Sequence, residues 1–308
     1  MDTAVSDVSV IIVNWNTKDL LRTCLRSVYE TTHAADLEVL VVDNASSDGS
    51  VCMVEQEFSP VKLLKNEYNI GHTAANNQAI KQARSPYILL VNSDVKMLDG
   101  CIDRMKALMD ERPQIAALSA RSLDPGGKPQ ADCRRFPKLA TALFDDTCLG
   151  WWFPDNGVIA RYRYRDWQHN DFRRVEQPPL TCFMVRKEVF DRIGLFDERF
   201  FLYFNDPDFC YRMQCAGLAV FYTPEAQVVH FGGASIRQYG RAALSWQQGR
   251  LLYYRKHFGR YAGVYVKIVL CIDLLLRAAK FAVKKALRKA QPGELSGRYR
   301  LVAGVLAS

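Results

Sequence analysis

The chain has 308 residues, of which 49% are hydrophobic and 24% are charged. A chain of this length and composition can bury a sizeable core, which excludes a disordered protein and a multi-pass membrane protein. Its formal net charge of +8 favours anionic partners such as nucleic acid, sugar nucleotides or an anionic lipid surface. Many of the basic residues and very few acidic ones follow Arg255, which indicates a surface partner for the tail.

The nine cysteines are scattered and include no Cys-x-x-Cys pair. This pattern predicts small hydrophobic side chains in a reducing compartment. Residues 1–7 show no basic segment followed by an apolar core, so we expect no signal peptide and a cytosolic body.

The first 120 residues alternate short apolar runs with helical patterns. The runs predict strands over 8–13, 37–42, 61–64, 88–91 and 116–119. The patterns between them predict helices over about 17–29, 50–58, 71–83 and 99–110, the first capped by Thr17. Such alternation favours right-handed β–α–β units and a mostly parallel sheet, so the predicted fold class is α/β.

Polar clusters follow three of these strands, at Asn14–Asn16, Asp43–Gly49 and Asn92–Asp94. A further pair, Asn69 and Gly71, opens a predicted helix. Ligands of open α/β sheets bind beyond the carboxyl ends of the strands, so one crevice can collect all four groups. Each cluster taken alone is also ordinary turn chemistry or a helix cap, and both interpretations stay open.

Residues 121–180 lack a clear period. Within them the alternation of Arg and Tyr over 161–165 predicts a strand whose arginines form either a solvated hairpin face or an anion-binding face. Further strands are predicted over 181–185, 219–222 and 228–231, and helices over 187–193 and from Asn205 to Cys215.

The tail from Gly263 to Leu287 has a helical pattern with two contrasting faces. The apolar face holds Ile268, Ile272, Leu275, Leu276, Ala279 and Val283. The charged face holds Asp273, Arg277, Lys280, Lys284 and Arg288. Because charges interrupt the apolar runs, the pattern favours a basic amphipathic helix lying in a membrane interface over a spanning helix. Packing on the domain or on a second subunit, as in a homodimer, is the alternative.

The chain lacks the glycine-rich loops that hold phosphates in Rossmann dehydrogenases and P-loop enzymes. A divalent cation on a strand-end carboxylate can hold a diphosphate instead, because Mg²⁺ and Mn²⁺ bind through one or two carboxylates plus substrate phosphates. Asp94 is the expected anchor for that cation. Asp43 can accept hydrogen bonds from a base or ribose, or cap the following helix.

Six segments carry a family resemblance when they are taken in order. They lie at 8–16, 41–50, 69–77, 92–94, 196–208 and 230–235, and include Val-Val-Asp-Asn-Ala-Ser-Ser-Asp-Gly-Ser, Asn-Ser-Asp and Phe-Asn-Asp-Pro-Asp. The ordered set resembles glycosyltransferase family 2, most closely its bacterial rhamnosyltransferase-like branch, over roughly residues 8–258. The resemblance implies a GT-A fold, with a nucleotide-sugar-binding half at 1–120 and an acceptor-binding half at 121–240. The remaining region, 241–308, is expected to be helical, basic and membrane-associating.

The resemblance also implies roles for individual residues. Asp206 matches the catalytic base, although the preceding Glu of the family is Asn205 here. Asp94 matches the metal-binding end of the family's Asp-x-Asp motif, whose first position is Asn92 here, and His230 completes the metal site or contacts the diphosphate. The expected substrate-binding residues are Asn14, Trp15, Asp43, Asn69, Gly71, Asn76, Ser93 and Asp208. Without the resemblance, Asp206 before Pro207 is a helix N-cap and His230 a structural residue.

These expectations define an inverting, Mn²⁺- or Mg²⁺-dependent glycosyltransferase, peripheral on the inner face of the cytoplasmic membrane. The expected donor is a nucleoside diphosphate sugar, dTDP-rhamnose or a UDP-sugar, and the expected acceptor is a polyprenyl-diphosphate-linked glycan. No nucleic acid partner is expected. Two alternatives stay open, a sugar nucleotidyltransferase and a non-catalytic protein that binds a sugar nucleotide or glycan. The second is motivated by Asn92 and Asn205, which replace acidic residues.

Overall fold

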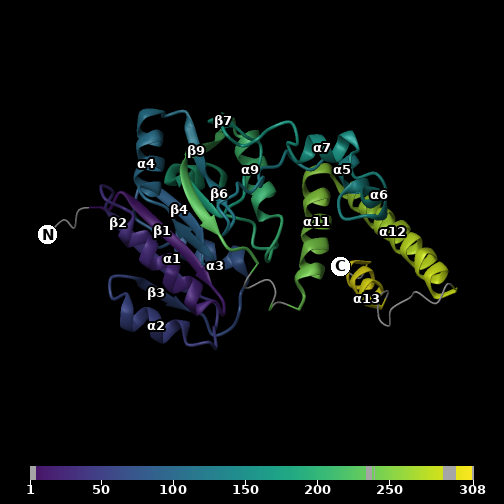
Figure 1. Cartoon of the computed structure of the whole chain (residues 1–308), viewed down its shortest axis with the longest axis horizontal. Coiled ribbons are helices and arrows are strands. Elements are labelled where there is room, and N and C mark those ends of the chain that lie inside the picture. Colours follow the sequence, from purple (N-terminus) through teal and green to yellow (C-terminus); the bar gives the residue numbers. More distant parts are fainter. Residues whose placement is uncertain (1–4, 234–237, 239, 287–295, 307–308) are drawn as a thin grey trace.

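The computed structural model describes residues 5–233, 238, 240–286 and 296–306. Within these residues nine strands form one sheet in the order β3-β2-β1-β4-β8-β6-β9-β5, with β7 paired to β9 (Figure 1). The strands are β1 (Val8–Asn14), β2 (Leu37–Asp43), β3 (Lys62–Lys65), β4 (Tyr87–Asn92), β5 (Val95–Met97), β6 (Ile115–Leu123), β7 (Arg173–Arg174), β8 (Cys182–Arg186) and β9 (Ala219–His230). All but β5, β7 and β8 point the same way, which confirms the mostly parallel sheet.

Helices cover both faces of the sheet, as the continuous apolar strands require. In β1, Val10 and Ile12 pack into one core with α1, α2 and α4, whereas Ile11 and Val13 pack into another with α3, α8 and α9. The first set is α1 (Lys18–Glu30), α2 (Ser50–Glu57) and α4 (Cys101–Glu111). The second set is α3 (His72–Ile80), α8 (Lys187–Ile193) and α9 (Asn205–Cys215). This three-layer arrangement leaves the strand ends open for a site.

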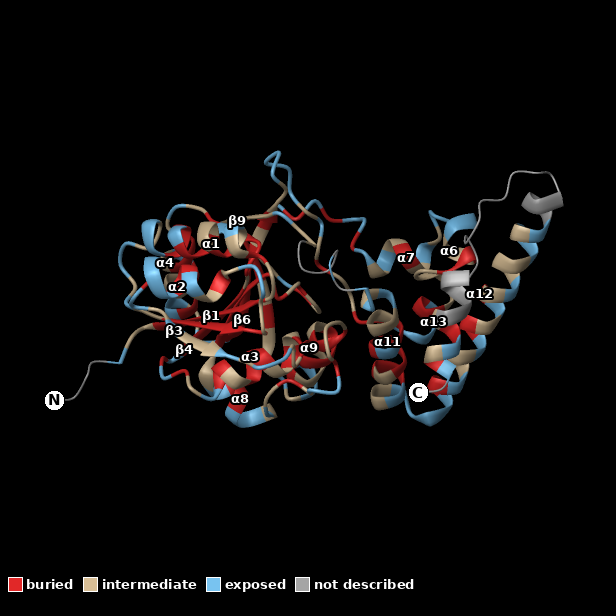
Figure 2. Cartoon of the chain, turned by 90° about the horizontal axis from the view of Figure 1, so that it is seen from below, coloured by how far each residue is buried: buried red, intermediate tan, exposed pale blue. Residues whose placement is uncertain are grey.

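A helical subdomain adjoins the sheet domain (Figure 2). Its helices are α5 (Leu139–Phe144), α6 (Cys148–Trp152), α7 (Gly157–Tyr162), α11 (Ala242–Phe258), α12 (Arg260–Ala286) and α13 (Ser296–Leu306). Its core joins residues such as Ala142, Leu251 and Val266 to Phe200, which comes from the segment before α9. Residues 139–162, which fall in the predicted half 121–240, therefore pack with the C-terminal helices.

Two predictions about strands were wrong. Residues 161–165 do not form a strand, because Asn156 begins α7 by accepting a hydrogen bond from the Ile159 amide (2.9 Å), and the chain then turns at Tyr164 with a φ of +47°. The strands predicted over 219–222 and 228–231 are one strand, β9. Its register against β6 shifts between Thr223 and Gln227, where Pro224 has no amide hydrogen to donate.

Candidate active site

A pocket of about 220 Å³, here called the strand-end pocket, opens beyond the carboxyl ends of β1 and β4. Its lining comes from β1, β4, the start of α3, the start of α9 and the end of β9. Four of the predicted site residues meet there, namely Ser93, Asp94, Asp206 and His230. The structure therefore brings together the residues predicted as base and as metal ligands, although about 110 residues or more separate Asp94 from the other two along the chain.

Asn14, Asp43 and Ser93 belong to one hydrogen-bonded network beneath this pocket. The Asn14 side-chain amide donates to Asp43 Oδ2 (2.8 Å), and the Thr17 hydroxyl donates to Asn14 Oδ1 (2.6 Å). The Thr17 and Ser93 hydroxyl oxygens lie 2.8 Å apart. The hydroxyl of Thr17 thus links two strand ends. Thr17 occupies the N-cap position of α1 as predicted, but its side chain does not make the capping hydrogen bond. Because Asn14 and Asp43 are buried and satisfied within the protein, they hold the strand ends in place.

Asp43 also accepts a hydrogen bond from the Ser46 amide (2.8 Å), which is the turn role that the sequence left open. Its contact with a base or ribose stays a prediction. Trp15 follows directly after β1 and is half-buried.

Asn69, Gly71 and Asn76 shape the start of α3. Asn69 Oδ1 accepts a hydrogen bond from the Gly71 amide (2.9 Å), and Gly71 has a φ of +91°. A Cβ at Gly71 would lie 2.6 Å from Cδ2 of Phe201, so only glycine lets this turn approach the segment that leads into α9. One turn further, Asn76 donates to the carbonyl of His72 (3.0 Å).

His72 lines the strand-end pocket and was not among the predicted site residues. Burial lowers the pKa of His72 to about 4, although the charge of Asp94 acts in the opposite direction. His72 is therefore neutral at neutral pH and can donate or accept a hydrogen bond there. The sequence could have indicated His72 by its position, because it is the first residue of a helix whose N-terminus points at the strand ends.

Asp94 and His230 face each other across the pocket, with 3.5 Å between Asp94 Oδ1 and His230 Nε2. The amide nitrogen of Gln130 donates to the His230 carbonyl (3.1 Å), so its oxygen Oε1 faces His230 Nδ1 at 3.0 Å. Gln130 therefore holds the imidazole ring so that Nε2 faces the Asp94 carboxylate. Two electron-donating groups held this way suit a shared cation. The sequence did not indicate Gln130, because this residue lies in the region 121–180, which has no clear period.

The described residues hold no group of three or more His, Cys, Asp or Glu side chains arranged for a metal. Asp94 and His230 would therefore supply two ligands. That number fits Mg²⁺ or Mn²⁺, which take their other ligands from water and substrate phosphates. The donor set thus fits a cation that binds together with a diphosphate.

Asp206 lies in the first turn of α9, where its Oδ2 faces the amide of Leu180 at 3.4 Å. Burial raises the pKa of Asp206 to about 6, and the amide hydrogen bonds only partly offset this. Phe204, not Asp206, occupies the N-cap position, so the capping interpretation of Asp206 was wrong. The neighbouring Asn205 is buried, and its side-chain nitrogen has no hydrogen-bond partner among the described residues.

Asp208 does not line the strand-end pocket. Its carboxylate contacts Lys256 Nζ (2.7 Å), His257 Nε2 (2.8 Å) and Arg212 Nε (3.1 Å), which ties α9 to α11. Burial opposes ionisation of Asp208, but hydrogen bonds from His257 and Lys256 and the nearby positive charges outweigh it and lower its pKa. Substrate binding by Asp208 stays a prediction, since in this structure the side chain joins two helices.

The pocket combines a carboxylate with a raised pKa, a candidate cation site and a helix start at the open edge of the sheet. A carboxylate of this kind can take a proton from a hydroxyl, and a cation can hold a diphosphate. Together with the sheet order, these features agree with the GT-A fold and the sugar transfer that the sequence predicts.

The comparisons with known proteins identify the family. The sequence profile of Glycosyl transferase family 2 matches residues 9–194, and the chain belongs to this family. The N-acetylglucosaminyl-diphospho-decaprenol L-rhamnosyltransferase of Mycobacterium tuberculosis is 31% identical over 205 residues, which cover 63% of this chain and 66% of that protein. This match confirms the resemblance to a rhamnosyltransferase-like branch.

Two solved structures share the fold. The mannosyltransferase PcManGT from Pyrobaculum calidifontis, in complex with GDP-Man and Mn²⁺, aligns with a TM-score of 0.56 and 16% identity, over 99% of this chain and 86% of that chain. S. aureus TarS 1-349 aligns with a TM-score of 0.53 and 16% identity, over 97% of this chain and 70% of that chain. At this identity they support the GT-A fold alone.

Proposed function

We propose that this glycosyltransferase moves a sugar, rhamnose in the first instance, from a nucleoside diphosphate sugar to a polyprenyl-diphosphate-linked acceptor in cell-surface glycan synthesis. The observation that carries the proposal is the meeting of Asp206 with Asp94 and His230 in the strand-end pocket. The name of the mycobacterial relative supports the choice of rhamnose and of a lipid-linked acceptor. A nucleoside diphosphate donor agrees with the charge and ligand number of the Asp94–His230 pair.

In the proposed reaction Asp206 accepts the proton of an acceptor hydroxyl. The oxygen forms a bond to the anomeric carbon, while the bond from that carbon to the diphosphate oxygen breaks and its electron pair leaves with the nucleoside diphosphate. Attack and departure occur on opposite faces, so the configuration inverts. A divalent cation held by Asp94 and His230 would stabilise the charge of the leaving diphosphate. The raised pKa of Asp206 makes its carboxylate a stronger base than an exposed aspartate.

We also propose that the enzyme works on a membrane surface. Figure 2 shows that parts of α12 are exposed. The exposed residues of this helix include an apolar stripe, between 49% and 74% exposed, made of Tyr261, Val264, Ile268, Ile272 and Leu275. The inner face is tied to the subdomain, because buried Asp273 accepts hydrogen bonds from the Cys148 amide and from Arg277 (both 2.7 Å). The side chains of Val283, Lys284 and Arg288 lie outside the described residues.

A second apolar feature adjoins the stripe. Trp151, Trp152 and Phe153, at the end of α6, are at least half exposed, and the Arg277 guanidinium lies 4.0 Å from the centre of the Trp151 ring. Exposed tryptophans beside basic residues favour the headgroup region of a bilayer. No described helix is long and apolar enough to cross a bilayer. The exposed stripe and the tryptophans support an interfacial attachment.

The catalytic part is tested by sugar transfer with purified protein, Mn²⁺, a panel of sugar nucleotides and N-acetylglucosaminyl-diphospho-decaprenol. We expect transfer from one donor, lost in Asp94→Ala and Asp206→Asn. Donor binding without transfer to any acceptor would contradict the proposal and favour a sugar-nucleotide-binding protein. Transfer that is unaffected in both variants would contradict the assigned roles.

A further inference from the structure

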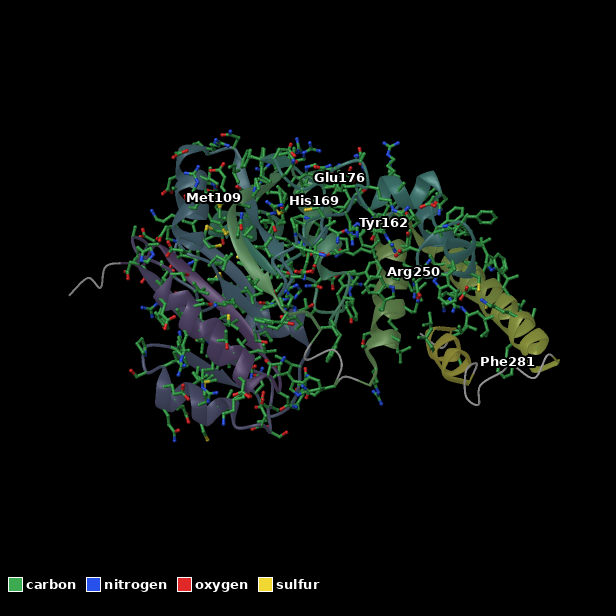
Figure 3. All side chains as sticks on the ribbon, viewed as in Figure 1. Met109, Tyr162, His169, Glu176, Arg250 and Phe281 are labelled. Carbon is green, nitrogen blue, oxygen red and sulfur yellow. The ribbon has the colours of Figure 1, made fainter. Side chains whose placement is uncertain are left out.

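The subdomain contains a cavity that the proposed mechanism does not use. It has a volume of about 860 Å³ and lies between α5, α6 and α7 on one side and α11 on the other. Tyr162 lies on its wall and is labelled in Figure 3, near α11. Tyr203 lines both this cavity and the strand-end pocket, so the two spaces meet at that side chain. We call this space the arginine cavity, after its lining residues Arg134, Arg163 and Arg165.

The three arginines outnumber the two acidic residues of the wall, Asp145 and Asp146. Arg163 Nη2 pairs with Asp145 (3.1 Å). The excess positive charge of the wall therefore comes from Arg134 and Arg165. Arg165 Nη1 contacts Asp155 (2.9 Å), whose side chain is 92% exposed. An ion pair in that setting contributes little, so Arg165 can turn to another anion at small cost.

Arg134 has no carboxylate partner within 4.0 Å in the part of the chain that the structure describes. Its Nη1 donates to the backbone carbonyls of Ala131 (2.5 Å) and Cys133 (2.8 Å), which position the guanidinium without neutralising it. A guanidinium offers five donors in a planar fork that matches the oxygens of a phosphate. The wall therefore carries positive charge suited to a phosphate group.

Aromatic side chains line the cavity at two places. Tyr203, which also lines the strand-end pocket, packs edge to face on Trp246 with their ring centres 5.2 Å apart. Trp151 is 57% exposed, and its ring lies 4.0 Å from the guanidinium of Arg277 in α12. The cavity therefore shares one lining residue with the strand-end pocket and has another on the surface that we propose to lie in the membrane.

We propose that the arginine cavity binds the diphosphate of the lipid-linked acceptor. Arg134, Arg163 and Arg165 hold the two phosphates, the acceptor sugar extends past Tyr203 to Asp206, and the lipid leaves past Trp151. This assignment rests on the proposed function, because it takes its ligand from the proposed acceptor. It adds a subsite, in residues 134–165, that is separate from the donor site at Asp94.

The test measures binding directly, so that it does not depend on turnover. The full chain in detergent is titrated with farnesyl diphosphate, farnesyl monophosphate and farnesol, and separately with dTDP and UDP in the presence of Mn²⁺. The variants are Arg134→Gln and Arg165→Gln. The matched control is Arg161→Gln, an exposed arginine of α7 outside this cavity. Thermal unfolding verifies that each variant is folded.

We expect each cavity variant to weaken farnesyl diphosphate binding about tenfold or more, because a charge-assisted hydrogen bond is lost. Farnesol binding, nucleotide binding and the control should stay within about twofold of wild type. Unchanged farnesyl diphosphate binding in both variants would overturn the assignment. So would an equal loss for farnesol, or a loss confined to the nucleotides, which would assign the arginines to the donor diphosphate.

Sugar transfer then separates this inference from the proposed function. Arginine-dependent binding of farnesyl diphosphate without sugar transfer by the wild type would support the cavity and refute the transferase. Transfer by the wild type with an unchanged acceptor KM in both arginine variants would support the transferase and refute the assignment of the cavity.

Discussion

Replacing Asp206 with asparagine removes the proposed proton acceptor and keeps the shape of the side chain. The pKa of about 6, raised from 3.8 by burial, means that about nine-tenths of the enzyme holds an ionised Asp206 at pH 7. The wild-type kcat/KM should fall about tenfold for each pH unit below this pKa. In Asp206→Asn the rate at pH 7 should fall by about 10²- to 10⁴-fold, the usual contribution of a general base.

The same burial makes the ionised form of Asp206 destabilise the folded state, so removing the charge should not lower stability. The folded-state pKa lies above the unfolded value, so the folded state binds more protons between pH 3.8 and about 6 and becomes less stable as the pH rises through this window. A shift of about two units corresponds to about 3 kcal/mol at neutral pH, and this is an upper limit because Asp206 is part-exposed. Asp206→Asn should therefore unfold at the same or a higher temperature than the wild type at pH 7.

The assay combines initial rates of nucleoside diphosphate release between pH 5 and 8 with thermal unfolding of the same samples. Asp191→Asn, an exposed aspartate of α8, is the matched control and should change neither quantity. Loss of activity together with a lower unfolding temperature would indicate a structural role for Asp206. Retained activity within tenfold of wild type, with the same pH profile, would refute the assignment of the base.

Three further changes test the site and its surroundings. His230→Gln should raise the Mn²⁺ concentration for half-maximal activity at least tenfold, as loss of a ligand or its support does, with metal titration as the measurement. Asp208→Asn should lower the free energy of unfolding by about 3–5 kcal/mol, because Lys256 and Arg212 lose their buried partner, and chemical denaturation measures it. The double variant Ile268→Glu and Leu275→Glu should lose cosedimentation with anionic vesicles while it keeps transfer to a soluble acceptor.

Each of these predictions has an outcome that contradicts it. An unchanged metal requirement would remove His230 from the metal site. An unfolding free energy within about 1 kcal/mol of wild type would show that Asp208 does not hold α9 to α11. Unchanged vesicle binding would refute the membrane role of α12, and a change from dimer to monomer in the double variant would assign its stripe to a second subunit.

The sequence by itself determined the strands and their polar ends. Apolar runs such as 88–91, followed by Asn92 to Asp94, are local patterns, and parallel strands place their carboxyl ends at one edge of a sheet. The sheet order and the family membership confirm this interpretation. The strand ends alone indicated Asp94, and the resemblance to the family added Asp206 and His230 to the predicted site.

The tertiary structure decided which neighbours complete that site. Gln130 lies in an irregular segment and Tyr203 in the turn before α9, and each reaches the site through the packing of its segment. No periodic pattern in the sequence predicts that packing. Asp208 follows Asp206 by two residues, which is about 200° around a helix, so the same helix presents one carboxylate to the pocket and the other to α11. The arginine cavity likewise exists because residues 134–165 fold against a helix that begins about 80 positions later in the chain. Contacts between such distant segments depend on the whole fold, so local sequence patterns do not predict them.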